Sequence, residues 1–135
     1  VDAETCRYAL LVVANLSASA ANHARMTEER VLDKDTTENG PASLLQALAG
    51  FSSHRDITCR QHAVLALGNL CANPDNHEKV VAQGCIQTLI TNALPSEGES
   101  NHNVTNVQFQ SVAALRGLAS HPTIRVQLMR EKVLV

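Results

Sequence analysis

A ten-residue apolar segment, Gln61 to Leu70, recurs along this chain and constrains its fold more than any other feature. One copy lies 54 positions earlier, at Arg7 to Leu16, and another lies 48 positions later, at Phe109 to Leu118. A period of about 50 residues in a sequence of helical character is typical of stacked helical units rather than of a closed globule. Such stacks bind other macromolecules along an extended surface. The repeat therefore predicts a class of function and leaves the partner open.

The middle copy shows the layout of one unit. Asp56 is placed to cap a helix that runs to about Ala72, because its carboxylate accepts from the free N–H groups of the first turn. The dipeptide Asn73-Pro74 ends this helix and begins a short one, which stops at Gly84. A third apolar stretch follows at Ile86 to Leu94. The sequence thus predicts a long, a short and a medium helix in cyclic order.

The other copies show the same order, so residues 1–135 are predicted to be a single array of about three units. Two polar insertions without periodicity separate its helices. Because no polar capping unit is visible at either end, the chain is expected to be an excerpt of a longer array. If it is instead complete, its uncapped ends are expected to self-associate. The predicted divisions are a partial first unit and the start of the next at 1–51 (insertion at about 33–42), central helices at 52–94, a loop insertion at 95–103 and a last partial unit at 104–135.

The composition excludes several kinds of partner. Only 2% of the residues are aromatic and the net charge is −2, so a nucleic-acid surface of stacking rings or clustered basic residues is not visible. The longest apolar run, Ala9 to Ala14, is far shorter than the ~18 residues of a membrane span and is predicted to be one buried helix face. The cysteines lack metal-ligand spacing and are predicted to be buried free thiols, as in cytosolic or nuclear proteins: Cys6, Cys59, Cys71 and Cys85.

The spacing of polar residues argues against catalysis and metal binding. The triplet His54-Arg55-Asp56 resembles the catalytic loop of protein kinases, but Gln61 stands where that loop needs Asn, and no glycine-rich loop is present. No pair among the six histidines has metal-ligand spacing on one predicted helix face. His23 and His77 are equivalent positions of two copies, which indicates packing or capping. The sequence therefore predicts a non-enzymatic protein without metal or cofactor.

The repeated segment resembles the longest helix of armadillo repeats. That family's pattern, Ala-x-x-Ala-Leu-x-Asn-Leu, is matched by Ala63, Ala66, Leu67, Asn69 and Leu70. The short helix before Gly84 is similar to the family's sharp turn, whereas the paired helices of HEAT repeats lack it. The resemblance covers essentially the whole chain and implies an all-α fold, a right-handed α-α superhelix of about three repeats. Armadillo-only scaffolds of the vacuole and organelle-tethering type, which often carry a lipid anchor, are the most similar subgroup.

The resemblance also implies a binding groove, because the long helices of armadillo proteins line a concave surface. In importin-like members an Asn at the Asn69 position bonds the partner's backbone, and a Trp four residues earlier cages its Lys side chains. Leu11, Leu65 and Ala113 occupy the Trp positions here, which disfavours a receptor for nuclear-localisation signals. The groove residues so predicted are Tyr8, Leu11, Asn15, Thr58, Gln61, His62, Leu65, Asn69, Gln110, Ala113 and Gly117.

Two functions remain open from the sequence. The first is a scaffold that binds an extended or helical segment of a partner protein along the groove, where Leu11 and Leu65 suit apolar anchors. The second is a structural module that assembles through its end faces or insertions, or an adaptor held at a membrane by a lipid anchor outside these residues. Asn15 and Asn69 either face a partner or hydrogen-bond neighbouring backbone. The expected location is the cytoplasm, with the nucleus or the cytoplasmic face of an organelle as alternatives.

Overall fold

The computed structural model describes residues 2–28, 43–94 and 102–130, and the regular elements within these ranges are helices. The predicted all-α class is therefore confirmed. Short 3₁₀ turns at Ala20–Asn22 and Pro74–Asn76 lead into two of the helices. The helices are α1 (Ala3–Ser17), α2 (His23–Met26), α3 (Leu44–Phe51), α4 (Ile57–Cys71), α5 (His77–Ala82), α6 (Cys85–Ala93), α7 (His102–Ala119) and α8 (Pro122–Arg130).

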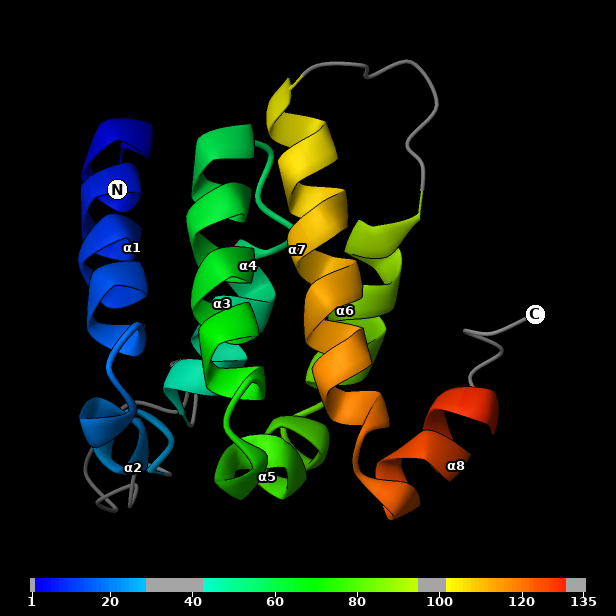
Figure 1. The fold of residues 1–135 in the computed structure, drawn as a ribbon. Coiled ribbons are helices and arrows are strands. Elements are labelled where there is room, and N and C mark those ends of the chain that lie inside the picture. The colour runs from blue at the N-terminus through cyan, green and yellow to red at the C-terminus, as the bar shows by residue number, and fades with distance from the viewer. Residues whose placement is uncertain (1, 29–42, 95–101, 131–135) are drawn as a thin grey trace, which may run out of the picture.

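The long helices stand side by side as one layer, with α4 between α1 and α7 (Figure 1). Behind them, α3 packs on α4 and α6 packs on α7, and the helices α2, α5 and α8 lie at one end of the molecule. Along the chain each long helix is followed by a shorter one, and α2 and α5 are followed by the medium helices α3 and α6. The predicted order of a long, a short and a medium helix is confirmed for α1 to α3 and for α4 to α6, whereas α8, with nine residues, is as long as α6.

Local capping chemistry sets the helix ends where the sequence predicts them. Asp56 Oδ1 accepts a hydrogen bond from Cys59 N at 3.0 Å, and Asn73 Oδ1 accepts one from Asp75 N at 3.1 Å. Gly84 has a φ of 76°, in the left-handed region that a side chain disfavours. These interactions satisfy backbone groups that a helix end leaves open, so the three predicted boundaries are confirmed.

The start of α7 differs from the predicted loop insertion at 95–103. His102 and Asn103 belong to the helix, whereas residues 95–101 lie outside the described ranges, as does the insertion predicted at about 33–42. Val104 and Val107 are buried in the first turns of α7, and their packing holds the helix in place from its beginning. Tertiary packing of this kind outweighs weak local helix propensity.

The core lies between the two layers and is centred on α4. Leu67 and Leu70 of α4 are completely buried, because α1 and α7 flank this helix and α3 lies behind it. The predicted burial of the whole run from Ala9 to Ala14 is wrong, since Ala9, Leu11 and Val12 are exposed. Successive residues of a helix point in different directions, and α1 has a long-helix neighbour on one side alone within the described residues.

Equivalent hydrogen bonds close the end of the long helix in the first and second units. His23 Nε2 lies 2.7 Å from Ser17 O, and His77 Nε2 lies 2.7 Å from Cys71 O. A carbonyl oxygen can only accept, so each imidazole donates from Nε2 and satisfies a carbonyl that the helix end leaves open. The predicted packing or capping role of the two histidines is confirmed.

The third unit keeps this bond with a different side chain. Arg125 Nε donates to Ala119 O at 3.0 Å, at the position that a histidine occupies in the other units. Asn76, a buried residue of the second unit, is replaced in the third by buried Ile124. The units therefore share their packing more closely than their polar contacts.

Candidate functional site

The structure brings four of the predicted groove residues into one shallow pocket between α1 and α4. The pocket has a volume of about 230 Å³ and is lined by residues of these two helices. We call it the groove pocket. Its lining residues are Glu4, Arg7, Tyr8, Leu11, Thr58 and His62.

Helical spacing explains which residues share this face. Tyr8, Leu11 and Asn15 follow one another at intervals of three and four along α1, and all three are exposed. Tyr8 is more open than Leu11, with 64% of its surface exposed against 38%. The matching row on α4 is only partly exposed because α4 has a long helix on each side; it consists of Thr58, Gln61, His62, Leu65 and Asn69.

The third row of predicted groove residues lies on α7, and this helix approaches α4 closely. The Gln110 side chain lies against Gly68, where an added Cβ would stand 3.8 Å from Gln110 Oε1. A Cβ on Gly117 would stand 3.1 Å from Cys71 O, closer than ordinary contact allows. A side chain at 117 would therefore require α7 and α4 to separate by a few tenths of an ångström, and glycine stands here in place of the repeated Asn. Ala113 is exposed and adds a methyl group to this row.

Asn69 connects two helices rather than facing open solvent alone. Its Nδ2 donates to Ser17 Oγ at 3.0 Å, and Ser17 Oγ in turn donates to Ala14 O at 2.7 Å. This chain links the middle of the layer to the end of α1. Asn69 thus bonds a neighbouring side chain, whereas Asn15 lies exposed on the outer helix.

The groove pocket holds little net positive charge although Arg7 lines it. Arg7 Nε donates to both carboxylate oxygens of Asp56, each at 3.2 Å, so the guanidinium is matched by a carboxylate. The Arg7 guanidinium, together with the Cys59 N–H, holds the pKa of the Asp56 carboxyl well below its usual range. Asp56 is the helix cap that the sequence predicts, but its ion pair spans 49 positions and has no local sequence signal.

Burial lowers the pKa of His62, since removal of water disfavours the charged imidazole. His62 is therefore neutral near pH 7. With Arg7 paired to Asp56, the pocket offers a phenol, an isobutyl group, a hydroxyl, a neutral imidazole and the carboxyl group of Glu4. This set suits apolar contact and hydrogen bonding more than recognition of a charged group. Glu4 is a lining residue that sequence reasoning did not identify.

The Asp56→Asn variant is expected to lower the unfolding temperature at pH 7, because Asn retains a capping oxygen but loses the charge that holds Arg7. The folded pKa of Asp56 lies below its unfolded value near 3.8, so its stabilisation is complete above about pH 4 and declines as pH falls. Thermal unfolding followed by circular dichroism at pH 7, 5 and 3 should show the difference from wild type shrinking at pH 3. A difference that stays constant with pH would contradict the ion-pair assignment.

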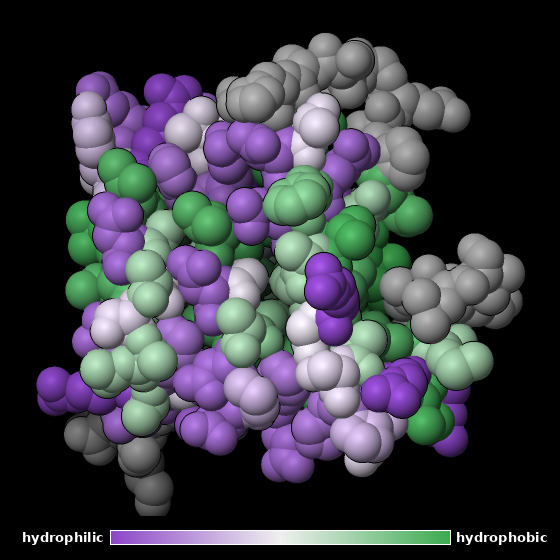
Figure 2. All heavy atoms as spheres, in the orientation of Figure 1, coloured by the Kyte–Doolittle hydropathy of each residue, from purple (hydrophilic) through white to green (hydrophobic). Residues whose placement is uncertain are grey.

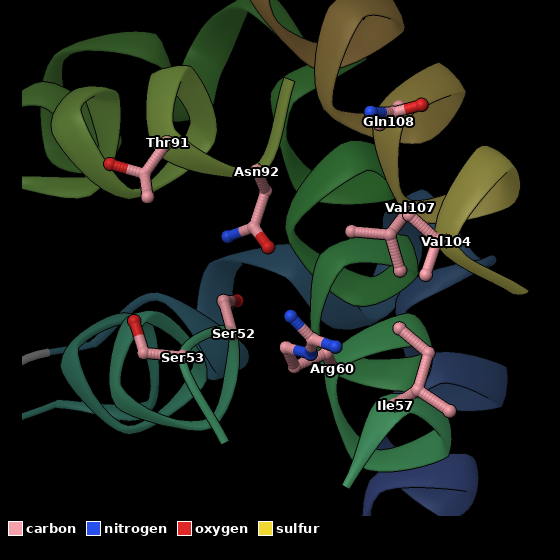
Figure 3. Close-up of a pocket in the computed structure, with 9 residues that line it drawn as sticks. All are labelled: Ser52, Ser53, Ile57, Arg60, Thr91, Asn92, Val104, Val107 and Gln108. Atoms are coloured by element: carbon pink, nitrogen blue, oxygen red, sulfur yellow. The ribbon is translucent and has the colours of Figure 1, made fainter. Parts of the chain in front are cut away.

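A second cavity, of about 240 Å³, lies where α3 and α6 end and α4 and α7 begin (Figure 3). Arg60 points into the space between Ser52, Asn92 and Val107. Several polar groups around this space are engaged with backbone carbonyls: Ser52 Oγ donates to Leu48 O at 2.7 Å and Asn92 Nδ2 to Thr88 O at 2.9 Å. Each bond lies within the end of a single helix, so these polar groups are already used by local backbone, and the groove pocket is the better candidate site. The lining residues come from separate helices and their connections and show no sequence pattern: Ser52, Ser53, Ile57, Arg60, Thr91, Asn92, Val104, Val107 and Gln108.

The cysteines behave as structural residues. Burial raises the pKa of the Cys59 and Cys85 thiols to about 11 and that of Cys71 to about 12, so they are protonated and unreactive near pH 7. The prediction of buried free thiols is confirmed for these three, while Cys6 is free and half-buried.

The described residues contain neither a group of potential metal ligands nor a membrane-spanning helix. Among residues 2–28, 43–94 and 102–130 no three His, Cys, Asp or Glu side chains are grouped as metal ligands would be. In that same part of the chain, no helix combines the length and the apolar character that crossing a bilayer requires. Comparisons of the chain with protein-family models, with curated proteins and with solved structures find no match.

Proposed function

We propose that this chain is an armadillo-type array, a right-handed superhelix of about three repeats, that binds an extended or helical segment of a partner protein. The observation that supports it most directly is the groove pocket, where Tyr8 and Leu11 of α1 meet Thr58 and His62 of α4 on an open face. The equivalent imidazole bonds of His23 to Ser17 O and of His77 to Cys71 O support the repeat assignment. On this proposal the protein is a non-enzymatic cytoplasmic scaffold.

The chemistry of the pocket favours a partner with apolar anchors. Tyr8 presents an aromatic face together with a hydroxyl group, and Leu11 presents an aliphatic surface beside it. Arg7 is paired with Asp56, so long-range attraction between charges contributes little at this surface. Binding should therefore depend weakly on salt concentration.

A peptide-display selection against the folded chain tests this function. Selected peptides should bind the wild type and lose at least about tenfold in affinity for Leu11→Glu, because a carboxylate then faces their apolar anchor without a partner. Val12→Glu is a matched control, since Val12 is the next residue but points away from the groove pocket. Fluorescence anisotropy measures the three affinities. Peptides that bind the wild type and Leu11→Glu equally would refute groove binding.

The alternative function, an assembly module, is favoured by one separate observation. Exposed Val12 and Leu16 form an apolar stripe on the side of α1 that faces away from α4. An importin-like role gains no such support, because Leu11, Leu65 and Ala113 hold the positions of the caging Trp residues. Tethering to a membrane through a lipid anchor rests on the family resemblance alone.

A further inference from the structure

Two rows of side chains with the same spacing run along the boundary between α1 and α4, which we call the α1–α4 seam. The row on α1 advances by four, three, four and three residues, and the row on α4 repeats these steps 54 positions later. Side chains at such steps share one face of a helix. The rows are Glu4, Tyr8, Leu11, Asn15 and Ala18 on α1, and Thr58, His62, Leu65, Asn69 and Ala72 on α4.

A hollow lies at each end of the seam. The groove pocket lies in the first half of both helices, and a second hollow of about 580 Å³ lies where both helices end, lined in part by Ala18, Asn69 and Ala72. The two helices therefore run in the same direction, and their rows pair in layers. Figure 2 views the long-helix layer from this side and shows hydrophobic side chains interspersed among hydrophilic ones over α1 and α4.

The layers of the seam differ from one another in chemistry. From the beginning of the helices they are Glu4 with Thr58, Tyr8 with His62, Leu11 with Leu65, Asn15 with Asn69, and Ala18 with Ala72. The first layer is polar, the second is aromatic and the third is aliphatic. The fourth offers two amides, and the fifth offers two methyl groups beside the second hollow, where a large side chain has room.

The boundary between α4 and α7 continues this pattern poorly. Ala113 stands on α7 at the position of Leu65, and Gly117 stands at the position of Asn69, so the aliphatic and amide layers end at α4. The Gln110 side chain lies against Gly68 between the two helices. A partner that lies along the seam therefore meets paired side chains in every layer, whereas one that crosses the long helices meets them on α1 and α4 alone.

We propose that the α1–α4 seam binds one amphipathic helix of a partner protein, and that this helix lies lengthwise between α1 and α4. Steps of four and three residues are the spacing by which helices interdigitate their side chains when they lie nearly parallel. At a rise of 1.5 Å per residue, the rows are about 20 Å long, which corresponds to a helix of about four turns. The inference rests on the proposed function and specifies it, because the groove pocket becomes one end of a longer site.

The layers specify which side chains the partner helix carries. Large apolar residues suit the aromatic layer, the aliphatic layer and the alanine layer with its hollow. An Asn or Gln suits the layer of Asn15 and Asn69, because an amide both donates and accepts hydrogen bonds. Glu4 lines one end of the seam and Asp75 lines the other, so basic residues suit both ends of the helix. Both carboxylates are exposed, so these ion pairs add little affinity and the apolar layers supply most of it.

Helix-locked peptides of about 15 residues are suitable probes. Each is alanine-based, with a hydrocarbon staple on the face away from the seam and a Lys at each end. One carries Leu, Leu, Asn and Leu in the order and spacing of the second to fifth layers, and another carries them in reverse, so both directions are sampled. In a control peptide the Asn and the central Leu are exchanged. By fluorescence anisotropy, one of the two directions should bind wild type at least about tenfold more tightly than the control.

A pair of matched variants distinguishes lengthwise from crosswise binding. Ala72 and Ala113 are both exposed, but Ala72 lies further along the seam at the end of α4, whereas Ala113 lies across from Leu65 on α7. Ala72→Glu should weaken binding of the peptide at least about tenfold, because a carboxylate then lies beneath its terminal Leu. Ala113→Glu should leave the affinity unchanged. The opposite result would show that the peptide crosses the long helices and would overturn the proposal.

The proposal is also overturned if neither peptide binds at concentrations up to about 1 mM, or if the control peptide binds equally well. Peptides from the display selection keep the two levels of the argument apart. If they lose affinity for Leu11→Glu but bind Ala72→Glu like wild type, groove binding stands and the lengthwise helix is wrong. If they bind Leu11→Glu like wild type, the proposed function itself is wrong. Circular dichroism of each variant confirms that it is folded.

Discussion

Leu70→Ala is expected to lower the free energy of unfolding by about 3–4 kcal/mol. Leu70 is 0% exposed and belongs to the core that the two layers share. Truncation removes its apolar contacts and leaves a cavity that α1 and α7 cannot close, because α4 is held from both sides. Small domains unfold with a total free energy of about 5–15 kcal/mol, so this loss removes a large part of the stability.

Leu16→Ala is the matched control, since Leu16 holds the same position in the first unit but is 48% exposed. Its expected cost is about 1 kcal/mol, because the site borders solvent and no closed cavity forms. Urea unfolding followed by far-ultraviolet circular dichroism measures the free energy of unfolding of both variants. Equal losses of unfolding free energy for Leu70→Ala and Leu16→Ala would contradict the central position of α4 in the core.

Asn76→Ala is expected to cost about 2–3 kcal/mol of unfolding free energy, because it leaves a buried acceptor without its donor. Asn76 is 2% exposed, and its Nδ2 donates to Leu70 O at 3.0 Å. The same amide nitrogen lies 3.0 Å from His23 Nδ1 and ties the second unit to the first. Asn73 keeps a contact of 3.2 Å to that imidazole, so the main loss is the bond to Leu70 O.

Asn22→Ala serves as its control in the first unit. Asn22 Nδ2 donates to Leu16 O at 2.9 Å, but the residue is half-buried and water can replace the bond. The expected cost is about 1 kcal/mol or less. The same urea titration compares the two variants. If Asn22→Ala lowers the free energy of unfolding as much as Asn76→Ala does, burial of the side chain does not determine the size of the effect.

The imidazole of the first unit and that of the second differ in their contacts to the unit that follows. His23 Nδ1 receives amide donors from Asn73 and Asn76, whereas His77 Nδ1 has no hydrogen-bond partner among the described residues. The ring of His77 instead packs edge-on against His121, with centroids 6.1 Å apart. Ile124 stands where an amide donor would be needed, so apolar burial replaces the polar contact.

Helix ends were predictable because their chemistry is local. Asp56, Asn73 and Gly84 each act on backbone groups within a few positions, and the structure confirms all three. The beginning of α7 was not predictable in this way. Its first turn is held by Val104 and Val107, whose burial depends on helices far away in the sequence.

The candidate site was predictable in part. Helical periodicity correctly placed Tyr8 and Leu11 on one face of α1 and His62 on the matching face of α4, and these residues meet in the groove pocket. The contacts that decide the chemistry of this face were not predictable. The pair of Arg7 with Asp56 joins residues 49 positions apart, and the bond of Asn69 to Ser17 Oγ spans 52.

The repeated segment by itself determined the helical character of the chain, the order of its helices and the positions that are equivalent between units. Only the tertiary structure decided what each equivalent position does. Leu16, Leu70 and Leu118 are the same residue at the same place in three units, yet Leu16 is 48% exposed while the others are fully buried. Side-chain type and spacing are properties of the chain, whereas burial depends on the helices that lie alongside. Within the described residues α4 and α7 each follow another long helix in the layer, whereas α1 is the first of the three and Leu16 stays exposed.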